Sequence, residues 1–222
     1  MTIFPGGVGI SGLSVYDWMA QDGACGGSPH LHLLCSEAYV VVAGEGQVQT
    51  LTGHGYMETS LTPGTVVSFT PGTVHRLVNG DGALQLVVIM QNDGLPEAGD
   101  AVFTFPAEIL ADPKVYAAAA AAPNEEAARR RRDLAIEGYL ELRESGPAAL
   151  AKFHRTALSL KHDRLETWRR RWEAAPLAAA QRTGDQLDSL RRGDVSYLLD
   201  ATLSQRSPQP RLGMCGHLNT YR

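Results

Sequence analysis

The chain has 222 residues, of which 44% are hydrophobic and 20% are charged, and this composition is typical of a globular protein with its own core. We expect neither a signal peptide nor a membrane span, because no charged segment precedes an apolar run at the start and no 18 apolar residues are consecutive. The three cysteines are irregularly spaced, which indicates free thiols in a reducing compartment. We therefore expect a cytoplasmic protein.

The net charge of −4 is divided unevenly along the chain. Residues 1–105 contain nine acidic side chains and a single basic one, Arg76, whereas residues 106–222 contain 15 acidic and 19 basic ones. This asymmetry predicts two halves that are built differently.

The first half consists of short runs rich in β-branched residues, separated by turns that contain glycine or proline. The runs are EAYVVVAG, GQVQTLT, GTVVSFT, TVHRLVN and ALQLVVIM. Turn signals every 8 to 12 residues or so are typical of an all-β sandwich or small barrel. Residues 1–105 are therefore predicted to form antiparallel strands joined by hairpins.

The second half is rich in Ala, Arg, Glu and Leu and is predicted to be an α-helical region over residues 106–206. We expect helices near 107–121, 124–144, 147–174, 177–192 and 194–204, separated by proline and glycine. Apolar residues recur at helical spacing and predict a bundle, which could pack on the barrel, form a dimer interface or cover the barrel mouth as a lid. The arginine runs 129–132 and 169–171 have acids nearby and fit solvated helix faces, so nucleic-acid binding is not expected.

Residues 207–222 change in character again and include PRLGMCGHLNTYR. This tail, which contains Cys215 and His217, could return to the barrel as an extra strand. His217 is then a candidate for contact with a substrate or with a neighbouring site residue, and the alternative is a surface histidine.

Four residues between positions 30 and 75 could bind one metal ion. His30 and His32 are two residues apart, so on a strand they project to the same side with Cα atoms about 6.6 Å apart. Glu37 has an odd offset from His32 and reaches that face only if a bulge or turn intervenes. His75 lies in a later apolar run, TVHRLV, after a turn at Pro71 and Gly72.

The spacing of these residues resembles the two motifs of the cupin family. HLHLLCSEAYVVVAG gives His30-x-His32-x4-Glu37-x6-Gly44, and PGTVHRLVN gives Gly72-x2-His75-x3-Asn79. Two positions depart from the family pattern: the leading glycine of the first motif falls on Ala24, and Pro71 directly precedes Gly72. The resemblance covers roughly residues 10–105 and says nothing about residues 106–222.

The resemblance implies an α+β protein whose N-terminal antiparallel β-barrel is of the cupin, or jelly-roll, type and is followed by a C-terminal α-helical region. It also implies that His30, His32, Glu37 and His75 are metal ligands that point into the barrel mouth. Three imidazoles and one carboxylate suit divalent Fe, Mn, Ni, Co or Zn, and the sequence does not choose among them. A six-coordinate ion would keep two open positions for a chelating substrate, whereas a tetrahedral zinc ion would be saturated.

Two more side chains are candidates for the catalytic pocket beside Glu37. Tyr39 has the same parity as Glu37 and could donate its hydroxyl to a substrate, with core packing as the alternative. His54 lies between two turn glycines, and the alternative for it is an exposed loop residue.

Three functions are compatible with the sequence. The first is a metal-dependent enzyme that acts on a small, oxygen-rich chelating metabolite, either by oxygenase-type chemistry or by isomerisation or epimerisation of a sugar-like hydroxy-carbonyl compound. The second is a metal- or ligand-sensing cupin with a helical effector region, and the third is a storage cupin without a reaction. We expect a small-molecule partner and leave a homodimer open.

Overall fold

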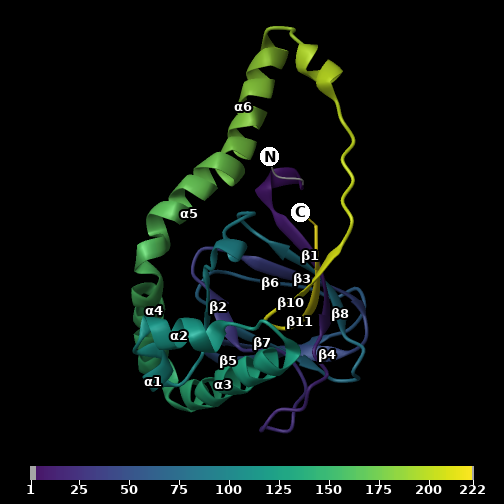
Figure 1. Ribbon diagram of the computed structural model, residues 1–222. Helices are drawn as coiled ribbons and strands as arrows, with labels where there is room; N and C mark the ends of the chain where they lie inside the picture. The colour runs from purple at the N-terminus through teal and green to yellow at the C-terminus, as the bar shows by residue number, and fades with distance from the viewer. Residues whose placement is uncertain (1–3, 222) are drawn as a thin grey trace.

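The computed structural model describes residues 4–221 and shows two facing antiparallel sheets with helices packed against one of them (Figure 1). The expected order, an antiparallel β-sandwich or barrel followed by a helical region, is confirmed. Both sheets contain strands that are far apart in the sequence.

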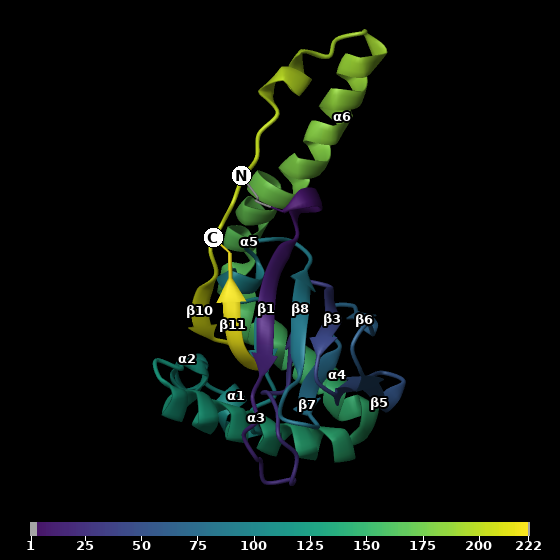
Figure 2. The same cartoon turned by 90° about the vertical axis from the view of Figure 1, so that its right-hand side faces the viewer.

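The first sheet has six strands in the order β10-β11-β1-β8-β3-β6, which lie side by side in Figure 2. All of its neighbouring strands are antiparallel. The strands are β1 (Gly9–Val15), β3 (Glu37–Ala43), β6 (Val66–Phe69), β8 (Gln85–Met90), β10 (Gln209–Leu212) and β11 (Gly216–Thr220).

The second sheet has five strands in the order β5-β4-β7-β2-β9, again antiparallel throughout. These are β2 (His30–His32), β4 (Gly46–Thr52), β5 (Gly55–Leu61), β7 (Val74–Asn79) and β9 (Ala101–Phe103).

Alternation of side chains along the strands gives the two sheets a shared interior. Residues such as Val41, Leu77 and Leu86 fill it between the sheets and form one buried cluster. Gly44 ends β3 with a φ of 73°, and a Cβ there would lie 2.4 Å from the Ala83 carbonyl oxygen, so only glycine fits this turn. The close approach holds the end of β3 against the loop that leads into β8.

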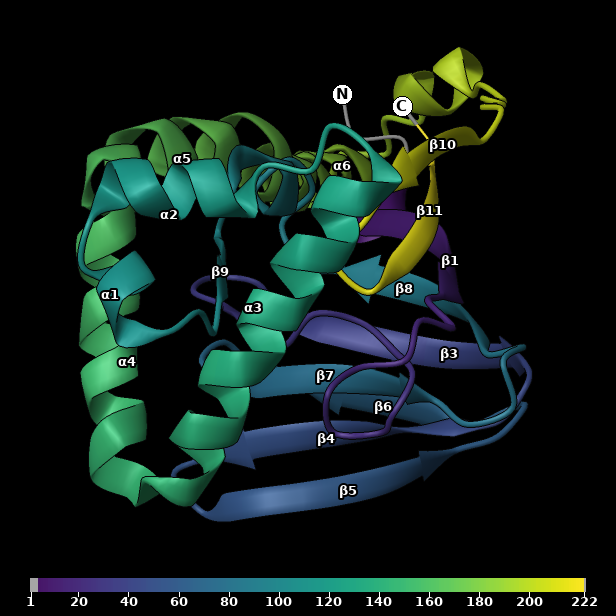
Figure 3. The same ribbon diagram turned by 60° about the horizontal axis from the view of Figure 1, so that its bottom comes forward.

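The helical region crosses the outer face of the five-stranded sheet (Figure 3). Its α-helices are α1 (Ala107–Leu110), α2 (Pro113–Ala120), α3 (Glu125–Glu144), α4 (Gly146–Lys161), α5 (Leu165–Trp172) and α6 (Ala178–Arg191). Short 3₁₀ turns lie at Pro5–Gly7, Pro96–Ala98, His162–Arg164 and Ser196–Asp200, and a π-helical turn spans Glu173–Leu177.

The helices that the periodicity predicted pack on the sheet through the apolar faces of α3 and α4. Leu31 and Val74 point outward from β2 and β7 and join Tyr139 of α3 and Phe153 of α4 in one buried cluster. Of the three arrangements left open by the sequence, the structure shows packing on the barrel. Beyond this face, Trp168 of α5 packs on Leu95 and donates a hydrogen bond to the Ala98 carbonyl, in the loop between β8 and β9.

The helix breaks also differ from the prediction. The expected helix over 147–174 is interrupted at His162–Arg164, whereas the chain stays helical through Pro176 because a π-helical turn accommodates the proline. The following helix, α6, extends away from the barrel (Figure 1), and none of its residues is buried. The homodimer considered from the sequence stays a prediction.

The tail returns to the barrel and adds two strands to it. β11 pairs with β1, and β10 pairs with β11 at the edge of the six-stranded sheet (Figure 2). None of the described helices combines the length and the apolar character that a membrane span requires. The compartment stays a prediction.

Candidate metal centre

The four candidate ligands come together from both sheets. His30 and His32 lie on β2, and His75 lies directly opposite His30 on the neighbouring strand β7. Glu37 is the first residue of β3 in the other sheet, so its carboxylate faces the histidines across the interior. One ligand atom of each residue lies within 4.8 Å of the other three, and all four side chains are buried.

Glu37 reaches the histidines because the chain bends between His32 and Glu37. The parity argument required a bulge or turn between His32 and Glu37. In the structure, residues 33–36 carry the chain from one sheet to the other, so the parity of a single strand no longer applies. The Glu37 Oε2 atom lies 3.1 Å from His75 Nε2 and 3.6 Å from His32 Nε2.

The outer nitrogen of each histidine faces an oxygen atom. His30 Nδ1 lies 2.9 Å from the Ser28 carbonyl, His75 Nδ1 lies 3.1 Å from the Thr73 carbonyl, and His32 Nδ1 lies 2.8 Å from Asp100 Oδ1. Carbonyl and carboxylate oxygens accept hydrogen bonds, so each Nδ1 is the donor. The Nε2 atoms then direct lone pairs toward the centre, which is the tautomer that a metal ion requires.

Asp100 is the functional residue that sequence reasoning missed. It is fully buried, and besides His32 it accepts hydrogen bonds from the backbone amides of Leu34 and Cys35, at 3.4 and 3.2 Å. Burial raises the pKa of Asp100, but the hydrogen bond and charge of His32, together with the hydrogen bonds from Cys35 and Leu34, outweigh it and lower the pKa overall. An ionised Asp100 thus fixes the ring of His32 and the turn that follows it.

Charges within the centre also set the protonation of its members. Burial lowers the pKa of His30 well below its usual range, and His75 and His32 lower it further. Burial raises the pKa of Glu37, but the neighbouring His75 and His32 outweigh it, so that its pKa is lowered and its carboxylate is ionised. Burial lowers the pKa of His32, whereas Asp100 and Glu37 together raise it above its ordinary value.

The residues fit a divalent metal ion. Glu37 Oε2 and His75 Nε2 are buried and have no hydrogen-bond partner, although buried polar atoms are normally satisfied. A cation between these atoms would satisfy both. Three imidazole nitrogens and one carboxylate oxygen form a donor set suited to first-row transition metals, and nothing in it selects one of them.

The centre borders a cavity of about 240 Å³. Its wall includes His30, His32, Glu37 and Tyr39, together with apolar side chains of β1 and β8 such as Leu13 and Val88. No residue of the helical region 106–206 contributes to the wall of this cavity. The volume suits a small metabolite.

Tyr39 and His54, the two further pocket candidates, have different outcomes. Tyr39 borders the cavity and is part of the buried core, so its packing role is confirmed and its contact with a substrate stays a prediction. Burial and the Glu37 carboxylate raise the pKa of Tyr39 well above its usual range, so its hydroxyl remains a donor. The placement of His54 in the pocket is wrong, because His54 lies exposed in the tight β4–β5 turn and does not border the cavity.

The tail contributes to the cavity, although not through His217. His217 is exposed and contacts the rings of Tyr16 and Trp18. Cys215 is buried at the cavity wall, and burial raises the pKa of its thiol. All three cysteines are free, as expected.

Comparison with protein families matched residues 17–90 to the family described as "Cupin domain". Those residues form a cupin domain. The resemblance inferred from the two motifs is therefore confirmed, and the match leaves the helical region and the tail uncovered. No curated protein matched the chain.

Several solved structures are similar to parts of the chain. The capsular polysaccharide assembling protein CapF from Staphylococcus aureus is 21% identical over 36% of this chain and 23% of its own, with a TM-score of 0.33. The TDP-fucose-3,4-ketoisomerase WlaRA from Campylobacter jejuni is 11% identical over 43% of this chain and 64% of its own, with a TM-score of 0.34. The DMSP lyase DddQ from Ruegeria pomeroyi is 24% identical over 38% of this chain and 39% of its own, with a TM-score of 0.32.

Proposed function

We propose that this cupin is a metal-dependent enzyme that binds a small chelating metabolite in its cavity and carries out oxygenase-type chemistry. The observation that carries the proposal is the set of three Nε2 atoms and one carboxylate, within 4.8 Å of one another at the wall of a cavity. A bound divalent ion would polarise the oxygen atoms of a chelating ligand and, if redox-active, allow reaction with dioxygen.

The protein's own residues have separable roles in this proposal. His30, His32, His75 and Glu37 hold the ion, and Asp100 positions the ring of His32. Tyr39 keeps its proton at neutral pH and presents a hydroxyl at the cavity wall, where it can donate a hydrogen bond to a substrate oxygen. Burial of the four ligands keeps bulk water away from the centre.

The cavity wall favours oxygenase-type chemistry over isomerisation of a sugar-like compound. A sugar carries a hydroxyl on nearly every carbon, and each buried hydroxyl needs a hydrogen-bond partner. Much of the wall is instead apolar, and it is contributed by Phe4, Ile10, Leu13, Val88, Met90, Pro96, Leu212, Met214 and Leu218. We therefore infer a substrate with an apolar body and a chelating group.

The test begins with elemental analysis of protein purified without chelator. We expect one transition-metal ion per chain, loss of the ion in His30→Ala, and retention in His54→Ala, which removes an exposed histidine outside the cavity. Wild-type protein without metal, or His30→Ala protein that keeps it, would contradict the metal site.

The identity of the ion and the uptake of oxygen then separate the enzymatic alternatives. Iron that is bound tightly, with oxygen consumption in the presence of chelating metabolites, supports the oxygenase. Bound Mn, Co or Zn, without oxygen consumption but with interconversion of hydroxy-carbonyl isomers, would show that the protein is an isomerase and not an oxygenase. A metal-loaded protein that binds metabolites without turnover would indicate the sensing cupin.

A further inference from the structure

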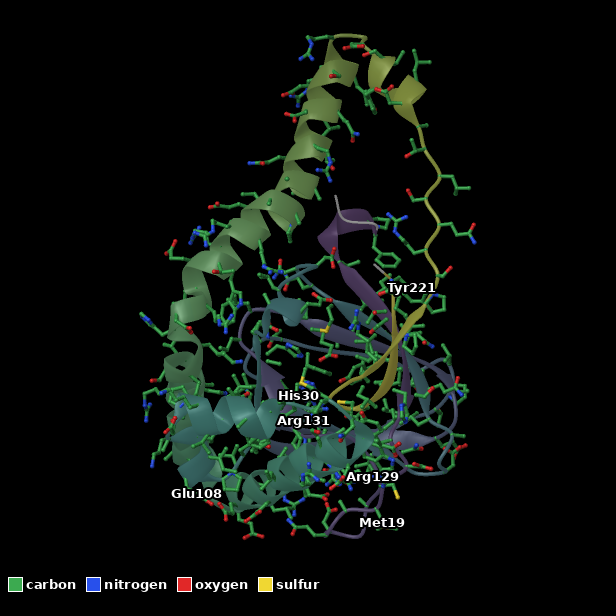
Figure 4. The ribbon with its side chains drawn as sticks, viewed as in Figure 1. Met19, His30, Glu108, Arg129, Arg131 and Tyr221 are labelled. Carbon is green, nitrogen blue, oxygen red and sulfur yellow. The ribbon has the colours of Figure 1, made fainter. Side chains whose placement is uncertain are left out.

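The C-terminal tail, which the cupin match does not cover, forms a large part of the cavity wall. The tail residues that border the cavity are Arg211, Leu212, Met214, Cys215, Leu218, Thr220 and Tyr221. Figure 4 labels Tyr221 near the chain's end and His30 on β2, both of which border the cavity. The choice of substrate therefore depends on residues outside the family motifs.

Strand register explains why Arg211 faces the cavity. Arg211 of β10 pairs with Leu218 of β11, and Leu218 pairs with Leu13 of β1. Residues directly opposite each other in antiparallel strands project to the same side of the sheet. Leu13 and Leu218 border the cavity, and Arg211 extends the same row to the sheet edge.

Among the described residues that line this cavity, Arg211 is the only lysine or arginine. Within the part of the chain that the structure describes, no carboxylate forms an ion pair with its guanidinium. Asp93 and Glu97 also border the cavity, but each already interacts with another group of the protein. Arg211 is exposed at the edge of the sheet, where its guanidinium borders the mostly apolar cavity wall and can bind an incoming anionic ligand through two parallel hydrogen bonds.

Arg211 and Glu37 lie on different strands of the same sheet, and β11, β1 and β8 separate them. Side chains of the three intervening strands, including Leu13, Val88 and Leu218, line the cavity between them. One molecule that contacts both ends must therefore present an apolar segment to these strands.

We propose that Arg211 is a substrate-binding residue that recognises a carboxylate at the end of the substrate remote from the chelating group. The inference rests on the proposed function, since it takes the four-residue centre as the binding site for the chelating end. It defines the substrate class as a chelating acid that carries a second, distal carboxylate.

The test compares 2-oxo diacids of increasing chain length, 2-oxoglutarate being the shortest, with 2-oxo monoacids of the same lengths. Both kinds of ligand carry the same chelating group, and only the diacids carry the distal carboxylate. Binding to cobalt-loaded protein is followed through the visible absorption of the cobalt ion. Arg211→Gln removes the guanidinium, and Arg211→Lys keeps the positive charge but cannot form two parallel hydrogen bonds. Arg206→Gln is the control, because it removes an exposed arginine that does not border the cavity.

We expect the wild-type protein to bind at least one diacid about tenfold more tightly than its matched monoacid. Arg211→Gln should abolish this preference and leave the monoacid affinity unchanged, Arg211→Lys should keep part of it, and Arg206→Gln should keep all of it. Equal affinities in the wild-type protein at every length, or a preference that persists in Arg211→Gln, would overturn the role of Arg211.

Failure of the proposed metal site gives a different result. If no 2-oxo acid changes the cobalt spectrum, these acids do not chelate the metal ion, and that part of the proposed function is wrong. Calorimetry of the same ligand pairs on metal-free protein then decides the role of Arg211. A diacid preference that Arg211→Gln removes would still support the anion site, whereas its absence would overturn it.

Discussion

Glu37 Oε2 and His75 Nε2 lie 3.1 Å apart in the interior, and neither atom has a hydrogen-bond partner. His75 Nδ1 donates a hydrogen bond to the Thr73 carbonyl at 3.1 Å, so only Nε2 of this ring faces Glu37. Glu37 is ionised and supplies only acceptors. A cation between the two atoms would satisfy both, so one substitution at Glu37 should act differently on the metal-free and the metal-bound protein.

Replacement of Glu37 by glutamine should stabilise the metal-free protein and weaken metal binding. The amide of glutamine can donate a hydrogen bond to His75 Nε2, which we expect to raise the free energy of unfolding by about 1 kcal/mol. Loss of the carboxylate ligand should lower metal affinity by at least the roughly 10- to 100-fold that outer partners of ligands contribute. Chemical denaturation of metal-free protein and competition with a chelator measure the two effects.

Glu108→Gln is the matched control for this experiment, because Glu108 is exposed on α1 and outside the centre. It should change neither quantity. A metal-free Glu37→Gln protein that is less stable than the wild type would show that the Glu37 carboxylate is favourably paired with His75 even without a metal ion.

Asp100→Asn should weaken metal binding without removing a ligand. The asparagine side chain could still accept a hydrogen bond from His32 but would lack the charge that orients this ring and strengthens it as a donor to the metal. We expect a loss of about 10- to 100-fold in affinity, read by chelator competition. Asp81→Asn is the control, since Asp81 accepts backbone hydrogen bonds at an exposed turn outside the ligand set. Equal affinities of Asp100→Asn and wild type would mean that the backbone alone orients His32.

The sequence predicted that the four candidate ligands come together because the motifs encode local strand geometry. His30 and His32 share a face by alternation, and the turn at Pro71 and Gly72 starts the strand that carries His75. Asp100 was not predicted because it lies 68 residues from His32, and no spacing rule links an acid on a loop to a histidine on a distant strand. His54 was misplaced because a histidine between glycines gives no information on which way a hairpin turn faces.

The sequence predicts where the helices of residues 106–206 begin better than it predicts what these helices pack against. Asn124 caps α3 and Asp112 caps α2 through side-chain hydrogen bonds, so local chemistry marks where these helices begin. Periodic apolar residues show that a helix face is buried but not what it is buried against. The stripe that includes Tyr139 could therefore not be assigned to the sheet surface around Leu31 from the sequence alone.

Asp22→Asn should destabilise the protein at neutral pH and lose its effect in acid. Asp22 pairs with Arg76, whose side chain has no exposed area, and Arg76 Nη2 lies 3.2 Å from Asp22 Oδ1. Burial raises the pKa of Asp22, but Arg76 outweighs it, so the pKa falls below its ordinary value of 3.8. Because the folded-state pKa is the lower one, the pair contributes stability above the unfolded-state pKa and loses it as pH falls through the folded-state pKa.

We expect the stability difference between wild type and Asp22→Asn to be about 2 kcal/mol at pH 7, less than for a fully buried pair because Asp22 is partly exposed. The difference should narrow as the pH falls below 3.8. Urea denaturation across this range measures it, and Asp17→Asn, at an exposed position, is the control. A difference that stays constant with pH would assign the effect to packing and not to the charge.

Gly138→Ala and Gly184→Ala should have effects of opposite sign, although both substitutions are within α-helices. A Cβ at Gly138 of α3 would lie 2.2 Å from the Thr104 carbonyl oxygen, so the helix would have to move away from the chain that follows β9. A Cβ at Gly184 of α6 would meet nothing within 4 Å. We expect Gly138→Ala to lower the free energy of unfolding by about 1–3 kcal/mol, through overpacking.

Gly184→Ala should instead stabilise α6 by up to about 1 kcal/mol, since alanine loses less backbone entropy in a helix than glycine does. Thermal denaturation reports the first effect, and amide hydrogen exchange within α6 reports the second even if that helix opens independently of the barrel. If Gly138→Ala left stability unchanged, α3 would not need its close approach to residues 104 and 105, and the docking of the helical region on the cupin barrel would depend on the apolar cluster around Tyr139 alone.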